Sequence, residues 1–126
     1  MNIKISDAEL EVMRILWRED RPMSFTEIRK ELEEKTKWSK STMQTLVIRL
    51  RDKGIIGTQS HYVTLYTPNI SEQEYINSEG QSFLDKLFGG SAKNLVAALC
   101  RSGHLNEADI NELKSYFKAG GEEECL

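Results

Sequence analysis

Hydrophobic and polar positions recur with a helical period in residues 38–54, WSKSTMQTLVIRLRDKG. Ser39 is suited to cap the start of this helix, and Gly54 to end it in a left-handed conformation. Spacings of three, one and three place four apolar residues on one side: Met43, Leu46, Val47 and Leu50. The opposite side carries Ser41, Gln44, Thr45 and Ile48, with Lys40 and Arg49 beside them. The pattern therefore predicts a helix that buries one side and offers mainly hydrogen-bonding groups on the other.

Two further helices are predicted before this stretch. Each is started by a capping box, in which a serine and a glutamate three residues later bond each other's backbone amides. The first begins after Ser6 and is expected to end near Glu19, and the second begins after Ser24 and is expected to end near Lys35. Met23, between them, is expected to form a very short strand. The second and third helices are joined by a tight connection, as in a helix-turn-helix.

After Gly54 the hydrophobic period changes to the alternation that is typical of strands. Two strands are predicted at residues 55–59 and 62–67, with a turn at Ser60-His61 and an end at Pro68. Three helices followed by a β-hairpin is the element order of a winged helix, a helix-turn-helix variant whose third helix suits the major groove of DNA. The same fold also serves as a protein-interaction module, so the fold alone leaves both functions open.

Three more helices are predicted in residues 71–119. A capping box at Ser71 starts the first, which runs to about Phe88 before a glycine pair. Ser91 starts the second, which stops near Gly103, and Asn106 caps the last. We therefore expect a mainly α chain with a small β-hairpin. It is divided into a winged-helix DNA-binding domain at 1–70, a helical dimerisation domain at 71–119 and a flexible acidic tail at 120–126.

The last three predicted helices carry more large apolar side chains than a segment of this size can enclose. We expect a second copy of the chain to cover them across a two-fold axis; the alternative is that they pack back onto the N-terminal domain. The residues expected at this dimer interface are Tyr75, Phe83, Leu84, Leu87, Phe88, Leu95, Val96, Leu99, Ile110, Leu113 and Phe117. Such a dimer would present two recognition helices to the two halves of a palindrome.

Charge is unevenly distributed along the 126 residues, although the net charge is only −3. Residues 1–70 hold 12 Lys/Arg and 10 Asp/Glu, whereas residues 71–126 hold 5 and 10. The first half is therefore suited to approach phosphate, and the second would be repelled by it. No apolar run approaches the ~20 residues of a membrane helix, and no signal-peptide segment is visible. We expect a cytoplasmic protein without a membrane partner.

Residues capable of catalysis or metal binding are sparse. The two cysteines, Cys100 and Cys125, lack metal-binding spacing, and only His61 and His104 accompany them. No nucleophile–base set and no glycine-rich phosphate loop is visible. We therefore expect no catalytic residue, no metal and no cofactor, and an enzyme is the least favoured function. Cys100 is interpreted as a small core residue and Cys125 as a thiol on the tail.

Several segments together carry a resemblance to a known family. The first helix contributes Ile5-Ser6-Asp7-Ala8-Glu9, Val12-Met13 and Leu16-Trp17. The third helix contributes Trp38-Ser39, Thr42, Gln44-Thr45-Leu46, Arg49-Leu50 and Asp52-Lys53-Gly54. Further along follow Tyr66-Thr67-Pro68-Asn69-Ile70, Tyr75, Ser82-Phe83-Leu84 and Asn111-Glu112-Leu113. In this order, over about residues 3–118, the chain resembles the penicillinase-repressor family of winged-helix transcriptional repressors.

The resemblance implies a homodimeric repressor whose C-terminal helices intertwine and which occludes promoters of resistance genes. In that family, one branch is released by proteolysis in the dimerisation region, and another senses copper through C-terminal cysteines. This chain departs from both: the Asn-Phe cleavage position reads Ala98-Leu99, and the tail offers only Cys125. Its hairpin also lacks the Lys or Arg that family wings usually carry. The release signal is left open between a protease or sensor, a ligand, thiol oxidation at Cys100 and a partner protein.

The expected DNA contacts lie on the third helix and around it. Side-chain amides and hydroxyls can bond base edges in the major groove, and an exposed Ile48 can meet a thymine methyl group. The residues expected at bases are Ser41, Thr42, Gln44, Thr45 and Arg49, the last at either a guanine or a phosphate. The residues expected at phosphates are Ser24, Thr26, Lys37, Lys40, Lys53 and His61. The expected partners are thus a palindromic double-stranded operator and a second copy. The competing hypothesis is a winged helix that binds another protein through its neutral hairpin and acidic half.

Overall fold

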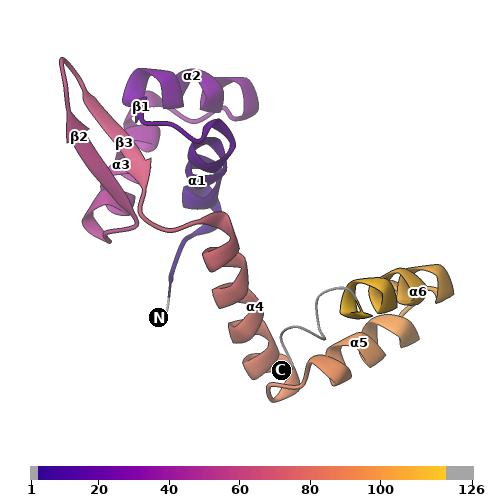
Figure 1. The fold of residues 1–126 in the computed structure, drawn as a ribbon. Helices are drawn as coiled ribbons and strands as arrows, with labels where there is room; N and C mark the ends of the chain where they lie inside the picture. Colours follow the sequence, from indigo (N-terminus) through magenta and orange to yellow (C-terminus); the bar gives the residue numbers. More distant parts are fainter. Residues whose placement is uncertain (1–2, 119–126) are drawn as a thin grey trace. The chain divides into compact units, whose positions relative to one another are not determined.

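The computed structural model describes residues 3–118, which form six helices and a three-stranded sheet (Figure 1). In chain order these are α1 (Asp7–Glu19), β1 (Met23–Ser24), α2 (Phe25–Lys35), α3 (Lys40–Asp52), β2 (Ile56–Ser60), β3 (Thr64–Pro68), α4 (Glu72–Phe88), α5 (Ala92–Arg101) and α6 (Glu107–Tyr116). Every predicted helix is present, and the mainly α class is confirmed. Internal contacts divide the chain into two units, residues 1–79 and 80–126.

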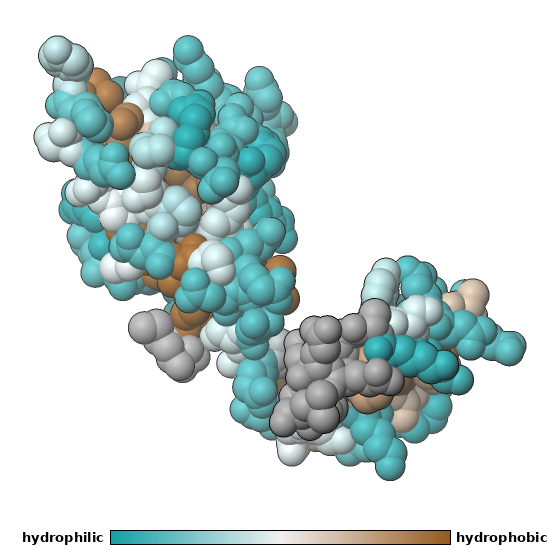
Figure 2. Space-filling model, viewed as in Figure 1, coloured by the Kyte–Doolittle hydropathy of each residue, from teal (hydrophilic) through white to brown (hydrophobic). Residues whose placement is uncertain are grey.

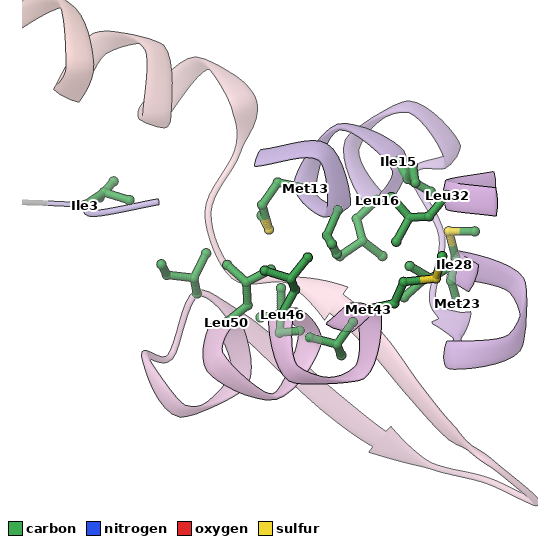
Figure 3. Packing of buried hydrophobic residues seen from close by; sticks show 14 residues of the cluster. Ile3, Met13, Ile15, Leu16, Met23, Ile28, Leu32, Met43, Leu46 and Leu50 are labelled. Carbon is green, nitrogen blue, oxygen red and sulfur yellow. The ribbon is translucent and has the colours of Figure 1, made fainter. Parts of the chain in front are cut away.

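The core of the first unit lies between α1, α2 and α3 (Figure 3). α1 supplies Met13, Ile15 and Leu16, α2 supplies Leu32 and α3 supplies Leu50, and all five are fully buried. Burying one side chain of this size stabilises a fold by about 1.5–3 kcal/mol. The three helices are therefore held together mainly by apolar contacts that none of them could make alone.

α3 begins and ends as its sequence predicts. Ser39 Oγ accepts a hydrogen bond from the Thr42 N–H at 3.1 Å, and Gly54 follows the helix with a φ of 79°. The four predicted core residues are at most 5% exposed: Met43, Leu46, Val47 and Leu50. Because this side of α3 is fixed against α1 and α2, its polar side faces outward.

The three strands form an antiparallel sheet in the order β1–β3–β2. The short strand predicted at Met23 is present, with Met23 opposite Tyr66 of β3. β2 and β3 pair over all five residues of each strand and form the predicted hairpin. Figure 1 shows this hairpin extending beyond the three N-terminal helices.

The turn of the hairpin is longer than predicted. It covers residues 61–63, where the His61 N–H donates to the Val63 carbonyl at 3.1 Å. A two-residue turn at Ser60-His61 would place both residues at positive φ, which favours Gly, Asn or Asp. Tyr62 and Val63 therefore lie in the connection, and their predicted place in a strand is wrong.

The start of α4 packs within the first unit. Trp17 Nε1 donates to the Ile70 carbonyl at 2.9 Å, and the Trp17 and Tyr75 rings are 5.8 Å apart between centroids. Tyr75 is half-buried against the core there. By internal contacts the first unit accordingly extends to residue 79. Tyr75, expected at the dimer interface, has its contacts inside its own chain.

The second unit keeps its apolar side chains at the surface. None of its described side chains, in residues 80–118, is buried. Phe83 is 47% exposed, Leu87 58% and Leu113 44%, and Figure 2 shows apolar patches beside polar ones over α5 and α6. Cys100 is exposed too, so its predicted core position is wrong for the single chain. Cys125 and the tail at 120–126 lie outside the described residues.

Candidate nucleic-acid interface

The outward side of α3 carries hydrogen-bonding groups and one arginine. Ser41, Gln44, Thr45 and Arg49 are all exposed, and Ile48 is 36% exposed among them. The predicted exposure of these residues is confirmed. One helix thus brings the groups expected at base edges onto a single surface, and a helix fits the ~12 Å width of the major groove.

Hydrogen bonds at the start of α3 determine which donors and acceptors of these side chains remain free to bind DNA bases. Thr45 Oγ1 donates to the Ser41 carbonyl at 2.9 Å, and Ser39 Oγ donates to Thr42 Oγ1 at 3.0 Å. Thr45 therefore retains acceptor lone pairs, whereas Thr42 retains a proton to donate. The Gln44 amide makes no hydrogen bond to the part of the chain that the structure describes. Gln44 is the best equipped for a base edge, because a glutamine amide can pair with adenine through two hydrogen bonds.

Basic side chains around α3 are of two kinds. Arg51 Nη2 lies 3.1 Å from Asp52 Oδ1, and Lys53 Nζ lies 2.7 Å from Glu9 Oε1. Three exposed cations form no ion pair within residues 3–118: Lys37, Lys40 and Arg49. A phosphate could bind these three without breaking an internal ion pair.

Lys53, expected at a DNA phosphate, is bound inside the chain. Its ammonium donates to Glu9 Oε1 at 2.7 Å and to the Lys4 carbonyl at 3.3 Å. Burial raises the pKa of the Glu9 carboxyl, but hydrogen bonds from Lys53 and Ser6 outweigh it and leave that pKa below its ordinary value. Moving Lys53 to a phosphate would leave a buried carboxylate unpaired. The capping-box role of Glu9 could be predicted from its spacing to Ser6. Its ion pair with Lys53 could not, because no nearby sequence pattern indicates a partner 44 residues away.

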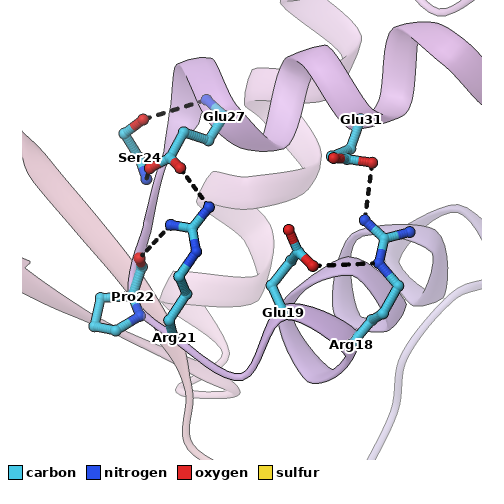
Figure 4. A network of polar contacts seen from close by, with 7 residues as sticks. All are labelled: Arg18, Glu19, Arg21, Pro22, Ser24, Glu27 and Glu31. Carbon is cyan, nitrogen blue, oxygen red and sulfur yellow. Dashed lines mark hydrogen bonds and ion pairs between the residues drawn. The ribbon is translucent and has the colours of Figure 1, made fainter.

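The N-terminus of α2 is a second place where a phosphate is expected (Figure 4). Ser24 Oγ accepts the Glu27 N–H at 3.2 Å, and the Glu27 carboxylate accepts the Ser24 N–H at 3.1 Å. Arg21 binds the same carboxylate at 2.6 Å and, with the Ser24 amide, lowers the pKa of Glu27. Arg21 thus neutralises the acid at this helix end. The Ser24 hydroxyl proton and the exposed Thr26 side chain remain available to donate to an anion.

The hairpin tip differs from a basic DNA-contacting wing. Residues 55–68 contain no Lys or Arg, and His61 is exposed at the tip. The connection also presents Tyr62, whose side chain is fully exposed, and Val63, which is 57% exposed. Sequence reasoning missed these two as tip residues. The signal that could have found them is the absence of Gly, Asn and Asp from the predicted turn.

Comparison of the sequence with known protein families gives one match that spans both units. A family model described as Penicillinase repressor matches residues 5–119, which include all six helices and the sheet. The chain belongs to the penicillinase repressor family. The resemblance seen in the sequence is thereby confirmed.

Curated relatives match this chain over most of their length. The penicillinase repressor of Bacillus licheniformis is 38% identical over 87% of this chain and 86% of its own. That of Staphylococcus aureus is 35% identical over 89% of each chain. The methicillin resistance regulatory protein MecI of Staphylococcus aureus is 29% identical over 89% of this chain and 91% of its own.

Solved structures cover the first part of this fold. The DNA-binding domain of the repressor BlaI matches with a TM-score of 0.54 and 42% identity, over 60% of this chain and 93% of its own. Bacillus licheniformis BlaI, in its monomeric form in complex with the blaP half-operator, matches with a TM-score of 0.53 at the same identity and coverage. The first unit of this chain is therefore a winged helix, as predicted. In the described chain, no helix is long and apolar enough to cross a membrane.

Proposed function

We propose that this chain binds an inverted-repeat DNA operator as a homodimer, with α3 of each copy in a major groove. Family and fold make the chain a DNA-binding transcriptional repressor. The observation that carries the proposal is the outward side of α3. There the Gln44 amide and the Arg49 guanidinium bind nothing in the described chain, within a domain 42% identical to BlaI in complex with a half-operator.

Base edges are contacted from the first turns of α3 in this proposal. Gln44 pairs with adenine through N6 and N7, which discriminates against a wrong base by about 1–3 kcal/mol. Thr42 donates from its hydroxyl and Thr45 accepts, while Ser41 can do either. Arg49, one turn after Thr45, takes guanine O6 and N7 or the adjacent phosphate. Ile48 meets a thymine methyl group between them.

Phosphates are held at the margins of the same surface. Lys37 precedes α3 and Lys40 is its first residue, and Ser24 and Thr26 lie at the N-terminus of α2, where the helix dipole favours an anion. His61, a polar residue at the hairpin tip, faces the DNA backbone in this proposal. Each neutralised phosphate contributes about 0.9 to the slope of log affinity against log salt. Lys53 is left out of this set because Glu9 holds it.

A second copy covers the apolar surface of residues 80–118. Six large apolar side chains there stay exposed in the single chain, from Val96 at 38% to Phe117 at 68%, and large contiguous apolar surfaces usually mark protein interfaces. An obligate dimer interface resembles a core cut in half, which fits the large apolar side chains, among them at least one leucine, on each of the three helices. The proposed interface comprises Phe83, Leu84, Leu87, Phe88, Leu95, Val96, Leu99, Ile110, Leu113 and Phe117. Tyr75 is omitted because it packs against Trp17.

Dimerisation then controls repression. Linking two winged helices makes the second half-site contact intramolecular and raises avidity by about 10²–10⁴-fold. A protease or sensor that separates the two copies would release the operator without altering α3. The relatives are named as a penicillinase repressor and a methicillin resistance regulatory protein. We therefore propose promoters of antibiotic-resistance genes as targets.

The test is selection of sheared genomic DNA from the source organism by purified full-length protein, followed by sequencing of the bound fragments. A Gln44→Ala/Arg49→Ala variant, which changes only exposed side chains, is selected in parallel. We expect a few promoters that share an inverted repeat to be enriched by the natural protein and lost with the variant. No enrichment by folded protein at low salt would contradict the proposal and favour a protein partner. Enrichment by a proven monomer would contradict its dimeric part.

A further inference from the structure

A cavity of about 590 Å³ lies in the first unit, where the start of the chain, the end of α3 and the segment after β3 meet. Ile3 and Ile55, each less than a tenth exposed, and the half-buried Ile70 present apolar edges to it, and Lys4, Lys53 and Asn69 add polar groups. Small-molecule sites typically have about 300–1,000 Å³ and the same mixture of apolar walls and a few polar groups. None of the residues that we assign to DNA or to the dimer interface lines this cavity.

The walls of the cavity are held in place by the chain itself. Asn69 Nδ2 donates to the Gly54 carbonyl at 3.0 Å, and the Asn69 N–H donates to the Ile55 carbonyl at 2.8 Å. The Ile55 N–H in turn donates to the Leu50 carbonyl of α3 at 3.0 Å. These bonds tie the end of α3 to the end of β3 without any ligand. Gly54, Ile55 and Asn69 are therefore fixed before a ligand binds, which reduces the ordering that a ligand must impose on this side of the open pocket.

The charge at the cavity favours an anion. Two ammonium groups, Lys4 and Lys53, line it, and no carboxylate does. Lys53 Nζ uses two of its three protons, on Glu9 Oε1 and on the Lys4 carbonyl, and its side chain is 41% exposed. One N–H of Lys53 is thus left for a ligand. Because Glu9 offsets one of the two positive charges, one remains uncompensated by any ion pair in residues 3–118.

We propose that this cavity binds a small amphipathic carboxylate. Its head accepts hydrogen bonds from Lys53 and Lys4, and its hydrocarbon body packs against Ile3, Ile55 and Ile70. A cation is repelled by the local charge, and a wholly polar anion gains nothing from the isoleucine walls. A ligand of about ten heavy atoms is expected to bind with a Kd on the order of 1 mM. This proposal does not depend on the DNA-binding proposal, and the failure of either one would leave the other unaffected.

The test uses octanoate as the probe and 1-octanol as its uncharged counterpart, titrated into the full-length protein with ¹³C-labelled isoleucine methyl groups. Ten isoleucines report at once, and three of them line the cavity. Ile48, on the outward side of α3, and Ile110, on α6, serve as internal controls. We expect saturable octanoate shifts at Ile3, Ile55 and Ile70 and not at the controls, with octanol weaker by about fivefold or more.

Two variants test the charged head group. Lys53→Met combined with Glu9→Gln removes the ion pair without leaving a buried charge, and Lys4→Gln changes only an exposed side chain. We expect the octanoate Kd to rise about fivefold or more in the first and more modestly in the second, with octanol binding unchanged. Octanoate shifts that fail to saturate, that affect Ile48 and Ile110 equally, or that keep the same Kd in both variants would overturn the proposal.

Discussion

The Glu9 carboxylate and the Lys53 ammonium lie 2.7 Å apart and join the first turn of α1 to the residue that ends α3. The same Glu9 oxygen accepts the Ser6 N–H at 2.9 Å. One side chain, only 2% exposed, therefore caps one helix and anchors another. Glu9 Oε2 is buried with no hydrogen-bond partner in the described chain. The bonds from Lys53 and Ser6 together compensate for burying this carboxylate, and the ion pair links the end of α3 to α1.

Loss of the Lys53 ammonium is expected to destabilise the fold. Lys53→Met leaves Glu9 as a buried carboxylate without its cation, so the free energy of unfolding should fall by about 1.5–3 kcal/mol. Adding Glu9→Gln should restore part of this loss, because no buried charge then lacks a partner. Urea unfolding at one fixed protein concentration measures both. Lys40→Met, at an exposed lysine without an ion pair, is the control and should stay within about 0.5 kcal/mol. An equal loss in the control would contradict the role given to the pair.

The same pair predicts a pH dependence with a definite sign. The pKa of Glu9 is lowered in the folded chain from its ordinary 4.5 by the bonds from Lys53 and Ser6, which outweigh burial. A lowered carboxyl pKa adds stability above the unfolded-state pKa, and this stability is lost as the pH falls through the folded-state pKa. The difference in unfolding free energy between the natural protein and Glu9→Gln should therefore be largest near neutral pH and shrink below pH 4.5. A difference that stayed constant or grew in acid would refute this account.

Two arginines on α3 should differ in their effect on DNA binding. Arg51 is paired with Asp52 at 3.1 Å, whereas Arg49 forms no ion pair with any described residue. Arg49→Ala should weaken operator binding more than Arg51→Ala. If Arg49 holds a phosphate, the log–log salt slope falls by about 0.9 per copy; if it holds a guanine, discrimination at one base pair falls by about 1–3 kcal/mol. Titrations against the selected operator over a range of salt separate the two. Arg49→Ala with affinity, base preference and slope unchanged would mean that α3 does not face DNA as proposed.

A charge placed in the proposed dimer interface should abolish tight operator binding. Leu87 is 58% exposed in the single chain, so Leu87→Asp should leave the fold intact and separate the copies. Operator affinity should then drop by about 10²–10⁴-fold. Ser82→Asp puts the same charge on another side of α4 and should preserve both the dimer and the affinity. Analytical ultracentrifugation and circular dichroism report the assembly and the fold. A Leu87→Asp monomer that still bound the operator tightly would refute the dimer mechanism.

The hydrogen bond between Trp17 and Ile70 should contribute measurably to stability. Trp17→Phe keeps an aromatic ring near Tyr75 but removes the indole N–H that bonds the Ile70 carbonyl at 2.9 Å. We expect the unfolding free energy to fall about 1 kcal/mol more than in Trp38→Phe, which also shrinks a half-buried ring but removes no indole hydrogen bond to any residue that the structure describes. Equal losses in the two variants, measured by urea unfolding, would assign the effect to ring size alone.

Much of the fold was predictable because its signals are local. The pairs Ser6–Glu9 and Ser24–Glu27 are three residues apart, and both form the capping boxes that their sequence indicates. The apolar stripe of α3 likewise repeats within four residues, so the buried side, and with it the outward Gln44, followed from periodicity. A helix carries such information within a few turns, whatever the rest of the chain does.

Contacts between distant residues were decided only by the tertiary structure. Glu9 and Lys53 are 44 positions apart, and Trp17 and Ile70 are 53 apart. Periodicity shows that a side is apolar but not what covers it, and for that reason Tyr75 was expected at the dimer interface although it packs on Trp17. The sequence by itself determined the helices, their caps and the outward polar side of α3. Packing determined which cations remain free for phosphate, because an ion pair depends on distance in space and not on spacing along the chain.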